Sequence, residues 1–212
     1  MKIISFCNNN SKTGKTTTAF NIAIKFSEKG LKVLAIDTDP KFDLTSMFGI
    51  KDIQSVKDYE LLDKNTKIET VAVNDNLEVI AIDTGRRGYG KYKALKNYLL
   101  TLEEYDVIII DTAPSFHEYL PSVLFASDIY VVAKDDWKET IGIKSVIDFA
   151  RDLNKKISGI ILTEKTSKEP SFEAFEKLLD EYQLKTTIKK EGENEKDYND
   201  LAEEIIRIEG LK

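Results

Sequence analysis

The feature that most constrains this fold is the stretch 8–17, Asn-Asn-Asn-Ser-Lys-Thr-Gly-Lys-Thr-Thr, which joins two regular segments. The apolar run 3–7 before it is typical of a strand, and the stretch after it, which ends near Gly30, is typical of a helix. When a strand, a tight loop and a helix follow one another, the loop's backbone N–H groups converge on an anion and the helix N-terminus adds partial positive charge. The sequence therefore predicts a phosphate-binding loop, although Gly14 is its only glycine.

Two side chains supply the chemistry that such a loop needs. Lys15 is placed to neutralise the β- and γ-phosphates of a nucleotide, and Thr16 is placed to offer its hydroxyl to Mg²⁺. The triplet Gly-Lys-Thr is also common by chance. On these residues alone, an ordinary connection between a strand and a helix stays open as the alternative.

Carboxylates follow two further apolar runs. Residues 33–36 lead into Asp37 and Asp39, and the continuous apolar run 107–110 leads into Asp111. An aspartate at the carboxyl end of a buried strand can support the Mg²⁺ shell of a nucleotide bound to such a loop, and open α/β sheets bind ligands at that edge. Asp37 or Asp39 could instead cap a helix that begins after Pro40.

Composition bounds the class of protein. The 212 residues predict one domain, 1–212, with an ordinary hydrophobic content of 42%. A net charge of −6 argues against a dedicated basic nucleic-acid binder, although it leaves room for a local basic face. Cys7 is the only cysteine, so we expect no internal disulfide and no cysteine-rich metal site, with Cys7 packed in the first strand. No signal peptide or long apolar span is visible, which predicts a cytoplasmic protein.

Strand and helix patterns alternate along the chain, which predicts an α/β fold with a doubly wound, mostly parallel sheet flanked by helices. The segment 50–76 is the least clear and carries a candidate short helix at 56–62. The expected strands are 2–7, 31–36, 77–82, 106–110, 128–133, 157–163 and 184–188, and the expected helices are 15–29, 91–103, 115–126, 139–153, 171–182 and 196–208.

With these motifs in place, the chain resembles the ParA family of partition ATPases, within the ParA/MinD group of P-loop proteins. The resemblance runs nearly end to end, and the short amino terminus is similar to that of the small plasmid-type members. The segments that carry it are 14–19, 37–40, 111–115, 126–128 and 201–205.

The resemblance implies a slow, Mg²⁺-dependent hydrolysis of ATP to ADP and phosphate, with ATP and Mg²⁺ as cofactors. It assigns catalysis to Lys15 and to Asp39, the latter orienting the attacking water. It places the metal near Thr16, Asp37 and Asp111. The implied nucleotide-binding residues are Asn10, Ser11, Lys12, Thr13, Gly14, Lys15, Thr16 and Thr17.

The resemblance also implies partners. ATP would promote a sandwich homodimer that binds DNA without sequence preference, and a ParB-like or ribbon-helix-helix centromere-binding protein would stimulate hydrolysis. A membrane partner is not expected, since the terminal helix is too acidic for an anionic membrane. Glutamates interrupt the lysines that could contact DNA, so a solvated mixed-charge surface is the competing interpretation. The candidate cations are Lys165, Lys168, Lys185, Lys189, Lys190, Arg86 and Arg87.

One departure from the family pattern matters for the mechanism. Asn10 stands where the family has a signature lysine that reaches the partner's phosphates, and Ser11 and Lys12 replace two glycines. Lys12 either substitutes for that lysine or is a solvated loop residue. Because Asn10 carries no charge, the rival hypothesis is a nucleotide-dependent switch with little or no hydrolysis that positions or regulates other proteins.

Three further side chains are weighed by their surroundings in the sequence. His117, the only histidine, has no nearby nucleophile or metal partner, so we expect a packed or surface role. Trp137 follows a strand and is expected either at a dimer contact or partly buried on its own domain. Asp43 resembles a switch-region acid, and we expect it to be solvated.

Overall fold

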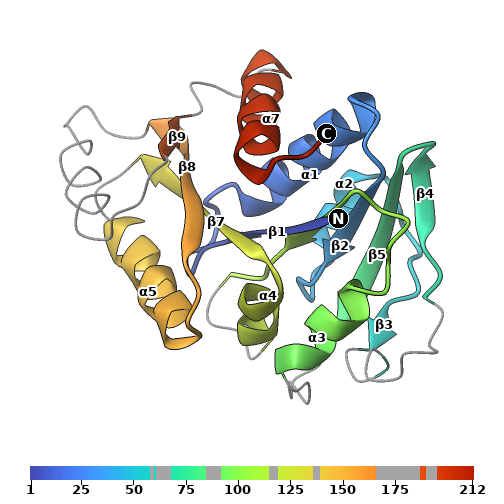
Figure 1. Ribbon diagram of the computed structural model, residues 1–212, viewed down its shortest axis with the longest axis horizontal. Coiled ribbons are helices and arrows are strands. Elements are labelled where there is room, and N and C mark those ends of the chain that lie inside the picture. The colour runs from blue at the N-terminus through green and yellow to red at the C-terminus, as the bar shows by residue number, and fades with distance from the viewer. Residues whose placement is uncertain are drawn as a thin grey trace.

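The computed structural model describes residues 1–57, 60, 68–84, 92–114, 119–135, 139–165, 187–189 and 195–212. Within these residues, nine strands form one sheet with helices on both faces (Figure 1). The strand order is β3-β5-β2-β6-β1-β7-β8-β9, and all of these neighbours pair in parallel. β4 pairs with β5 in the antiparallel direction. The expected doubly wound, mostly parallel α/β sheet is confirmed.

Each of the seven expected strands overlaps an observed one, and two more are present at the β5 edge. The strands are β1 (Lys2–Cys7), β2 (Val33–Asp37), β3 (Val56–Lys57), β4 (Val71–Asn74), β5 (Leu77–Asp83), β6 (Val107–Asp111), β7 (Asp128–Asp135), β8 (Ile157–Lys165) and β9 (Thr187–Lys189).

The predicted short helix at 56–62 is wrong at its start. Val56 and Lys57 form β3, in register with Ile82 and Asp83 of β5. Val56 also packs on the apolar cluster that β5 helps to form. This pairing with a distant strand overrides the local helical pattern, because the free edge of β5 offers backbone partners. Residues 58, 59 and 61–67 lie outside the described residues.

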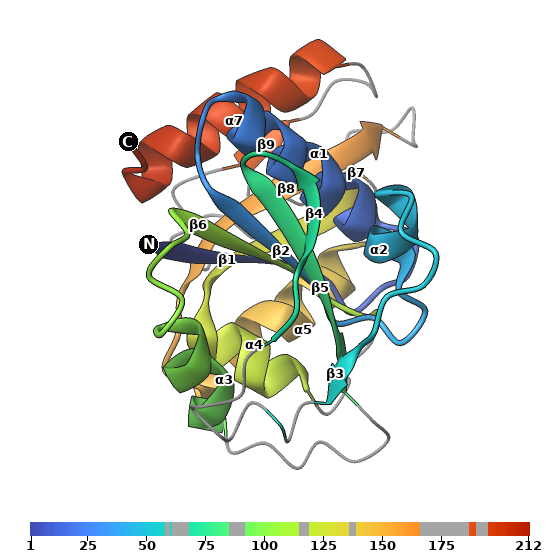
Figure 2. The same cartoon turned by 90° about the vertical axis from the view of Figure 1, so that its right-hand side faces the viewer.

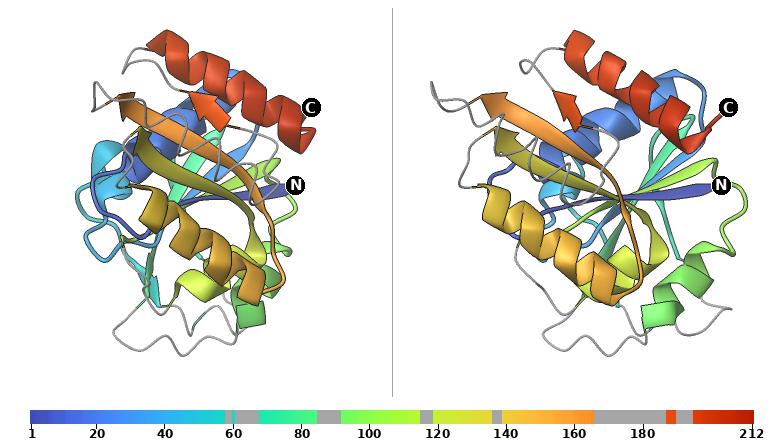
Figure 3. Two further views of the ribbon diagram at one scale, coloured as in Figure 1. Left: turned by 90° about the vertical axis from the view of Figure 1, so that its left-hand side faces the viewer. Right: turned by 60° about the vertical axis from the view of Figure 1, so that its left-hand side comes forward.

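The helices cover the sheet in two groups. α1, α2 and α7 lie on one face, and α3, α4 and α5 lie on the other (Figures 2 and 3). The short helix α2 was not among the expected helices, although a helix after Pro40 was the alternative interpretation of Asp37 and Asp39. The expected helix 171–182 lies outside the described residues. The helices are α1 (Lys15–Glu28), α2 (Asp43–Met47), α3 (Tyr92–Leu99), α4 (Leu120–Ala126), α5 (Glu139–Asp152) and α7 (Glu195–Glu209). None of them combines the length and apolar character that a membrane span requires.

The central strand β6 explains how the sheet supports two cores. All five of its residues are fully buried. Val107 and Ile109 join the cluster under α1 and α7, while Ile108 and Ile110 join the cluster under α3 and α4. Successive side chains of a strand point to opposite faces, so a strand buried on both faces needs an uninterrupted apolar run.

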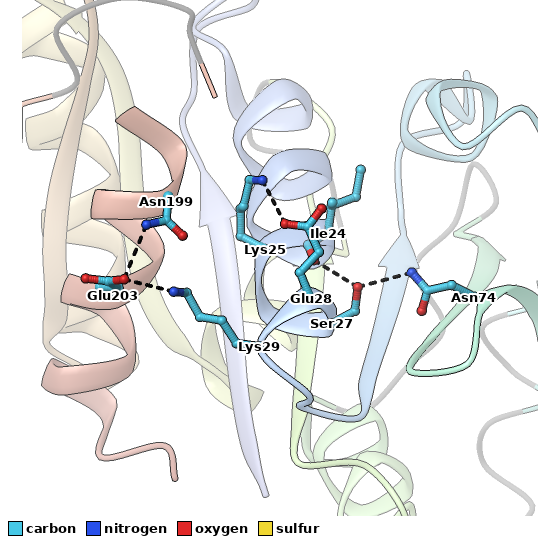
Figure 4. A network of polar contacts seen from close by, with 8 residues as sticks. All are labelled: Ile24, Lys25, Ser27, Glu28, Lys29, Asn74, Asn199 and Glu203. Atoms are coloured by element: carbon cyan, nitrogen blue, oxygen red, sulfur yellow. Dashed lines mark hydrogen bonds and ion pairs between the residues drawn. The ribbon is translucent and has the colours of Figure 1, made fainter. Parts of the chain in front are cut away.

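Polar contacts attach two neighbouring segments to α1 (Figure 4). On one side, Lys29 just beyond α1 donates to Glu203 of α7 over 2.9 Å, and Asn199 donates to the same carboxylate over 3.3 Å. On the other side, Asn74 of β4 donates to the hydroxyl of Ser27 over 3.2 Å. The helix that follows the predicted phosphate loop is thereby fixed between the C-terminal helix and the β4–β5 hairpin.

Cys7 ends β1 and is fully buried, as expected. Its Sγ donates to the carbonyl oxygen of Tyr130 over 3.7 Å. Burial raises the pKa of the thiol to about 12, with the Lys15 ammonium opposing the shift. The thiol therefore stays protonated at neutral pH and behaves as a small packed side chain.

We predict that a thiol reagent at pH 8 modifies Cys7 at least a hundredfold more slowly in the native protein than in denaturant. The folded pKa lies above the unfolded one, about 8.5. The folded state therefore holds this proton more tightly, and the contribution to stability is lost as pH rises from about 8.5 toward 12. Denaturant unfolding from pH 8 to 10 measures this loss, which Cys7→Ala should abolish. Equal modification rates in the native and unfolded states would contradict the prediction.

Candidate functional site

The site lies where three neighbouring strands end at the same edge of the sheet. In the register of β1, β6 and β2, Phe6 and Asp37 are both level with Asp111. Two threonines fasten these ends together. Thr38 donates from its hydroxyl and its backbone N–H to the carbonyl oxygen of Asp111, over 2.6 and 3.2 Å, and Thr112 donates from its hydroxyl to that of Phe6 over 2.9 Å. The three motifs found in the sequence therefore converge.

The loop between β1 and α1 depends on left-handed backbone at two positions. Gly14, the residue before α1, has φ of 92°, and Lys12 has φ of 58°. A β-carbon at Gly14 would lie 3.1 Å from the methyl carbon of Thr163 in β8. Thr163 also donates from its hydroxyl to the carbonyl oxygen of Thr13 over 3.0 Å. Gly14 is thus required both for its backbone conformation and for the close approach of β8.

Lys15 reaches back across this loop. Its side chain is buried, and Nζ donates to the carbonyl oxygen of Asn10 over 2.8 Å. Burial lowers the pKa of Lys15, and the charges of Asp111, Asp39 and Glu139 are among those that oppose the shift. An ammonium group held inside the curve of a loop is well placed to meet a phosphate oxygen, since the compact charge binds anions without a fixed planar geometry.

Asp111 provides the test of whether this site fits a divalent cation. Both of its carboxylate oxygens are buried, and neither accepts a hydrogen bond of normal geometry from the described residues. Burial raises the pKa of Asp111 well above its usual range, and neighbouring Asp37 adds to the shift, while Thr16 and Lys15 oppose it. A buried carboxylate without a partner is costly. A cation bound beside Thr16 would satisfy it, so these residues fit Mg²⁺.

The described residues contain no group of three or more His, Cys, Asp or Glu side chains that could hold a metal ion by themselves. Mg²⁺ commonly binds through one or two protein groups, several waters and substrate phosphates. The residues that fit the cation, Thr16 and Asp111, are few enough to leave room for those other ligands. A cation held by Thr16 and Asp111 would therefore need further ligands, such as waters or a phosphate.

Asp37 has a clear structural role. One of its carboxylate oxygens accepts the N–H of Asp39 over 3.1 Å, and the other accepts the N–H and the hydroxyl of Thr45, each over 2.9 Å. Burial raises the pKa of Asp37 to about 6, and the hydrogen bonds from Thr45 oppose the shift. Because Thr45 lies in the first turn of α2, this geometry matches the helix-capping alternative. Ligation of Mg²⁺ by Asp37 stays a prediction.

Asp39 lies within the segment that Asp37 fixes. It is buried, and its Oδ1 accepts the backbone N–H of Lys41 over 2.9 Å. Its negative charge is felt at Lys15 and Asp111. The carboxylate therefore belongs to the same polar centre, although its assignment to the attacking water stays a prediction. Asp43, in the first turn of α2, is exposed as expected.

The other predicted loop residues divide by exposure. Ser11, Lys12 and Thr17 are exposed, whereas Thr13 is buried and its hydroxyl has no hydrogen-bond partner in the described part of the chain. Lys165 and Lys189 end their strands. The remaining candidates lie outside the described residues: His117, Trp137, Arg86, Arg87, Lys168, Lys185 and Lys190.

Sequence reasoning missed a polar brace between the loop and α5. Asn8 donates to the carbonyl oxygen of Val132 over 2.7 Å, and its Oδ1 accepts the N–H of Asn10 over 2.9 Å. Asn10 in turn donates from Nδ2 to Oε2 of Glu139, the first residue of α5, over 3.0 Å. The three consecutive asparagines signalled a special loop, but nothing local pointed to Glu139.

Gly142 allows α5 to approach this brace. A β-carbon at Gly142 would lie 2.8 Å from Nδ2 of Asn10 and 3.0 Å from Oδ1 of Asn8. Glycine inside a helix weakens it relative to alanine, so its presence in α5 calls for a local reason. The close contact with the two asparagine side chains is that reason.

We predict that Gly142→Ala lowers the free energy of unfolding by about 1 kcal/mol, because the added methyl group displaces hydrogen-bonded side chains. Helix propensity alone predicts the opposite sign. Ser145→Ala, at a half-buried position three residues later in α5, is the control and should change stability by less than about 0.5 kcal/mol. Denaturant unfolding measures both. If Gly142→Ala is more stable than the native protein, the prediction is wrong, because the loop would then accommodate the methyl group without cost.

Comparison with known proteins identifies the family to which the chain belongs. Residues 1–163 match the AAA_31 family, described as an AAA domain. An uncharacterized protein of Methanocaldococcus jannaschii is 32% identical over 177 residues, which cover 73% of this chain and 67% of that protein. The virulence plasmid ParA family protein pGP5-D of Chlamydia psittaci is 30% identical over 179 residues, 77% of this chain and 69% of the relative.

Solved structures extend the similarity over almost the whole chain. A plasmid partition protein from Borrelia burgdorferi superposes with a TM-score of 0.76 and 28% identity, covering 98% of this chain and 96% of that one. A further Borrelia burgdorferi structure, bound to AMPPNP, superposes with a TM-score of 0.75 and 26% identity, covering 98% and 97% of the two chains. On its motifs, its fold and these relatives, the chain belongs to the ParA family of P-loop partition ATPases.

Proposed function

We propose that this protein is an ATPase of the partition type, which hydrolyses ATP slowly with Mg²⁺ and alternates between a nucleotide-bound dimer and a free form. The observation that carries the proposal is the buried carboxylate of Asp111, which accepts no hydrogen bond of normal geometry from the described residues and lies at the strand edge with Lys15 and Thr16. A nucleotide phosphate with its Mg²⁺ would satisfy all three groups. The AMPPNP in the related structure supports an adenine nucleotide as the ligand.

The chain's own residues divide the work. Lys15 would exchange the carbonyl oxygen of Asn10 for a phosphate oxygen, and Thr16 and Asp111 would hold the cation. Mg²⁺, when bound, would neutralise charge that develops on the phosphates. Asp39 would orient the attacking water, and Asp37, through Thr45, would keep that segment in place. Phosphoryl transfer needs such positioning more than a strong base.

DNA and a centromere-binding protein complete the proposal. The names of the plasmid partition and ParA family relatives support this role. We infer that the ATP-bound homodimer binds DNA without sequence preference. A ParB-like or ribbon-helix-helix protein that binds the centromere would then stimulate ATP hydrolysis, and the dimer would release the DNA. With a net charge of −6, DNA binding would require a local basic face, and it would weaken steeply with salt.

A second candidate function rests on Asn10. Its side chain bonds to Glu139 of the same chain, and it has no charge to offer to a partner's phosphates. A nucleotide-dependent switch with little hydrolysis, acting on other proteins, would need no such charge. The switch would be favoured if a partner protein does not raise the rate of ATP hydrolysis and if ATP does not cause the protein to retain DNA.

We predict that Asp111→Asn leaves the melting temperature in the absence of nucleotide unchanged or raises it, since an amide of similar shape replaces a buried carboxyl group that accepts no normal hydrogen bond from the described residues. The same change should abolish the extra thermal stability that ATP and Mg²⁺ confer on the native protein. Thermal unfolding with and without both ligands measures the two effects. If Asp111→Asn kept the full ligand-induced shift, Asp111 would have no part in binding the cation.

We predict that Asp39→Ala lowers phosphate release by at least about a hundredfold while ATP-driven dimers still form. Asp43→Ala is the matched control, because Asp43 is exposed in α2 and its loss should change turnover by less than about twofold. Light scattering measures dimerisation beside phosphate release. Nucleotide binding without dimers or turnover in the native protein would overturn the partition proposal in favour of the switch.

A further inference from the structure

We infer that Glu139 is a positioning residue that fixes the phosphate loop from within the same chain, through Asn10. The inference deepens the proposed function and rests on it, since the loop is taken to bind ATP. It gives position 10 a role in its own subunit, where the family pattern has a lysine directed at the partner.

Asn10 is held by three hydrogen bonds. Its backbone N–H donates to Asn8 over 2.9 Å, and its Nδ2 donates to Glu139 over 3.0 Å. Its carbonyl oxygen accepts Nζ of Lys15 over 2.8 Å. The peptide that receives the Lys15 ammonium is therefore oriented by the side chain of a residue in α5. Moving Glu139 would move the group that holds Lys15 ready.

Charge and packing support the same role for Glu139. It lies in the first turn of α5, where the helix dipole favours a negative charge. Its charge is felt at Lys15 and opposes the lowering of that residue's pKa by burial. Gly142, one turn further along α5, leaves just enough space for the Asn10 amide. The start of α5 is thus shaped around Asn10.

The loop needs such a brace because Lys12, which is not a glycine, takes a left-handed backbone conformation there. Ser11 and Lys12 are exposed and bring no buried packing, and Gly14 is the only glycine among residues 8–17. A loop that is already in its binding conformation loses less entropy when a ligand arrives. We therefore expect the hydrogen bond between Asn10 and Glu139 to contribute to nucleotide affinity without touching the nucleotide.

Titration with a fluorescent ATP analogue tests this role. Glu139→Ala and Asn10→Ala should each weaken binding by about fivefold, the loss of one charge-assisted hydrogen bond. Glu139→Gln retains an acceptor oxygen and should stay within about twofold of the native affinity. The double variant should be no weaker than either alanine variant, because both remove the same interaction. Native affinity in Glu139→Ala, or additive losses in the double variant, would overturn the inference.

Hydrogen exchange without nucleotide separates this inference from the proposed function. Amides in the segment 8–16 should exchange faster in Glu139→Ala than in the native protein, whereas Glu139→Gln should restore protection. If these amides exchange faster in Glu139→Ala but the native protein binds no ATP, the role of Glu139 is supported and the ATPase proposal is wrong. If the exchange is unchanged in Glu139→Ala, the inference about Glu139 is wrong even if the native protein binds ATP.

A lysine at position 10 gives an independent test. The carboxylate of Glu139 would pair with the ammonium of Asn10→Lys in the same subunit, so we expect the melting temperature to rise by about 2 °C. The rise should disappear when Glu139→Gln is added. A gain from Asn10→Lys that is equally large with Gln at position 139 would contradict the inference.

Discussion

The alignment of β1, β6 and β2 at their carboxyl ends is the constraint on which the rest of the site depends. It places Phe6 and Asp37 level with Asp111, so that a loop, a capped turn and a carboxylate meet at one edge. Backbone pairing along buried apolar strands sets this register, since a shift by one residue would turn every core side chain to the wrong face. The same strand register therefore determines both the packing of the core and the geometry of the site.

Around this frame, the chain concentrates groups that are costly to bury. Lys15, Asp37 and Asp111 are all buried. Burial lowers the pKa of Lys15 and raises the pKa of the two aspartates, which favours the neutral form of each group. Asp37 is compensated by Thr45 and the backbone of Asp39, whereas Asp111 has no such partners among the described residues. This uneven compensation distinguishes a carboxylate that shapes the fold from one that is left for a ligand.

The phosphate loop shows how a fold can accept a sequence that departs from its usual pattern. Hydrogen bonds from side chains hold this loop, in which Gly14 is the only glycine. Asn8 and Asn10 connect the loop to β7 and α5, and Thr163 connects it to β8. The conformation of the loop therefore depends on elements that lie more than a hundred residues later in the sequence. Changes in α5 should consequently be felt in nucleotide binding.

By itself, the sequence determined the alternation of strands and helices, the buried character of β6, and the residue types at the site, with Gly14 and Lys15 at the start of α1 and Asp111 at the end of β6. These follow from local periodicity and from short motifs, which need no knowledge of neighbours. Only the tertiary structure decided that Val56 extends the sheet, that Asp37 accepts the N–H of Thr45 in α2, and that Asn10 forms a hydrogen bond with a residue 129 positions away. Such pairings depend on the order and register of packed elements, and a local pattern does not encode which distant element lies beside it.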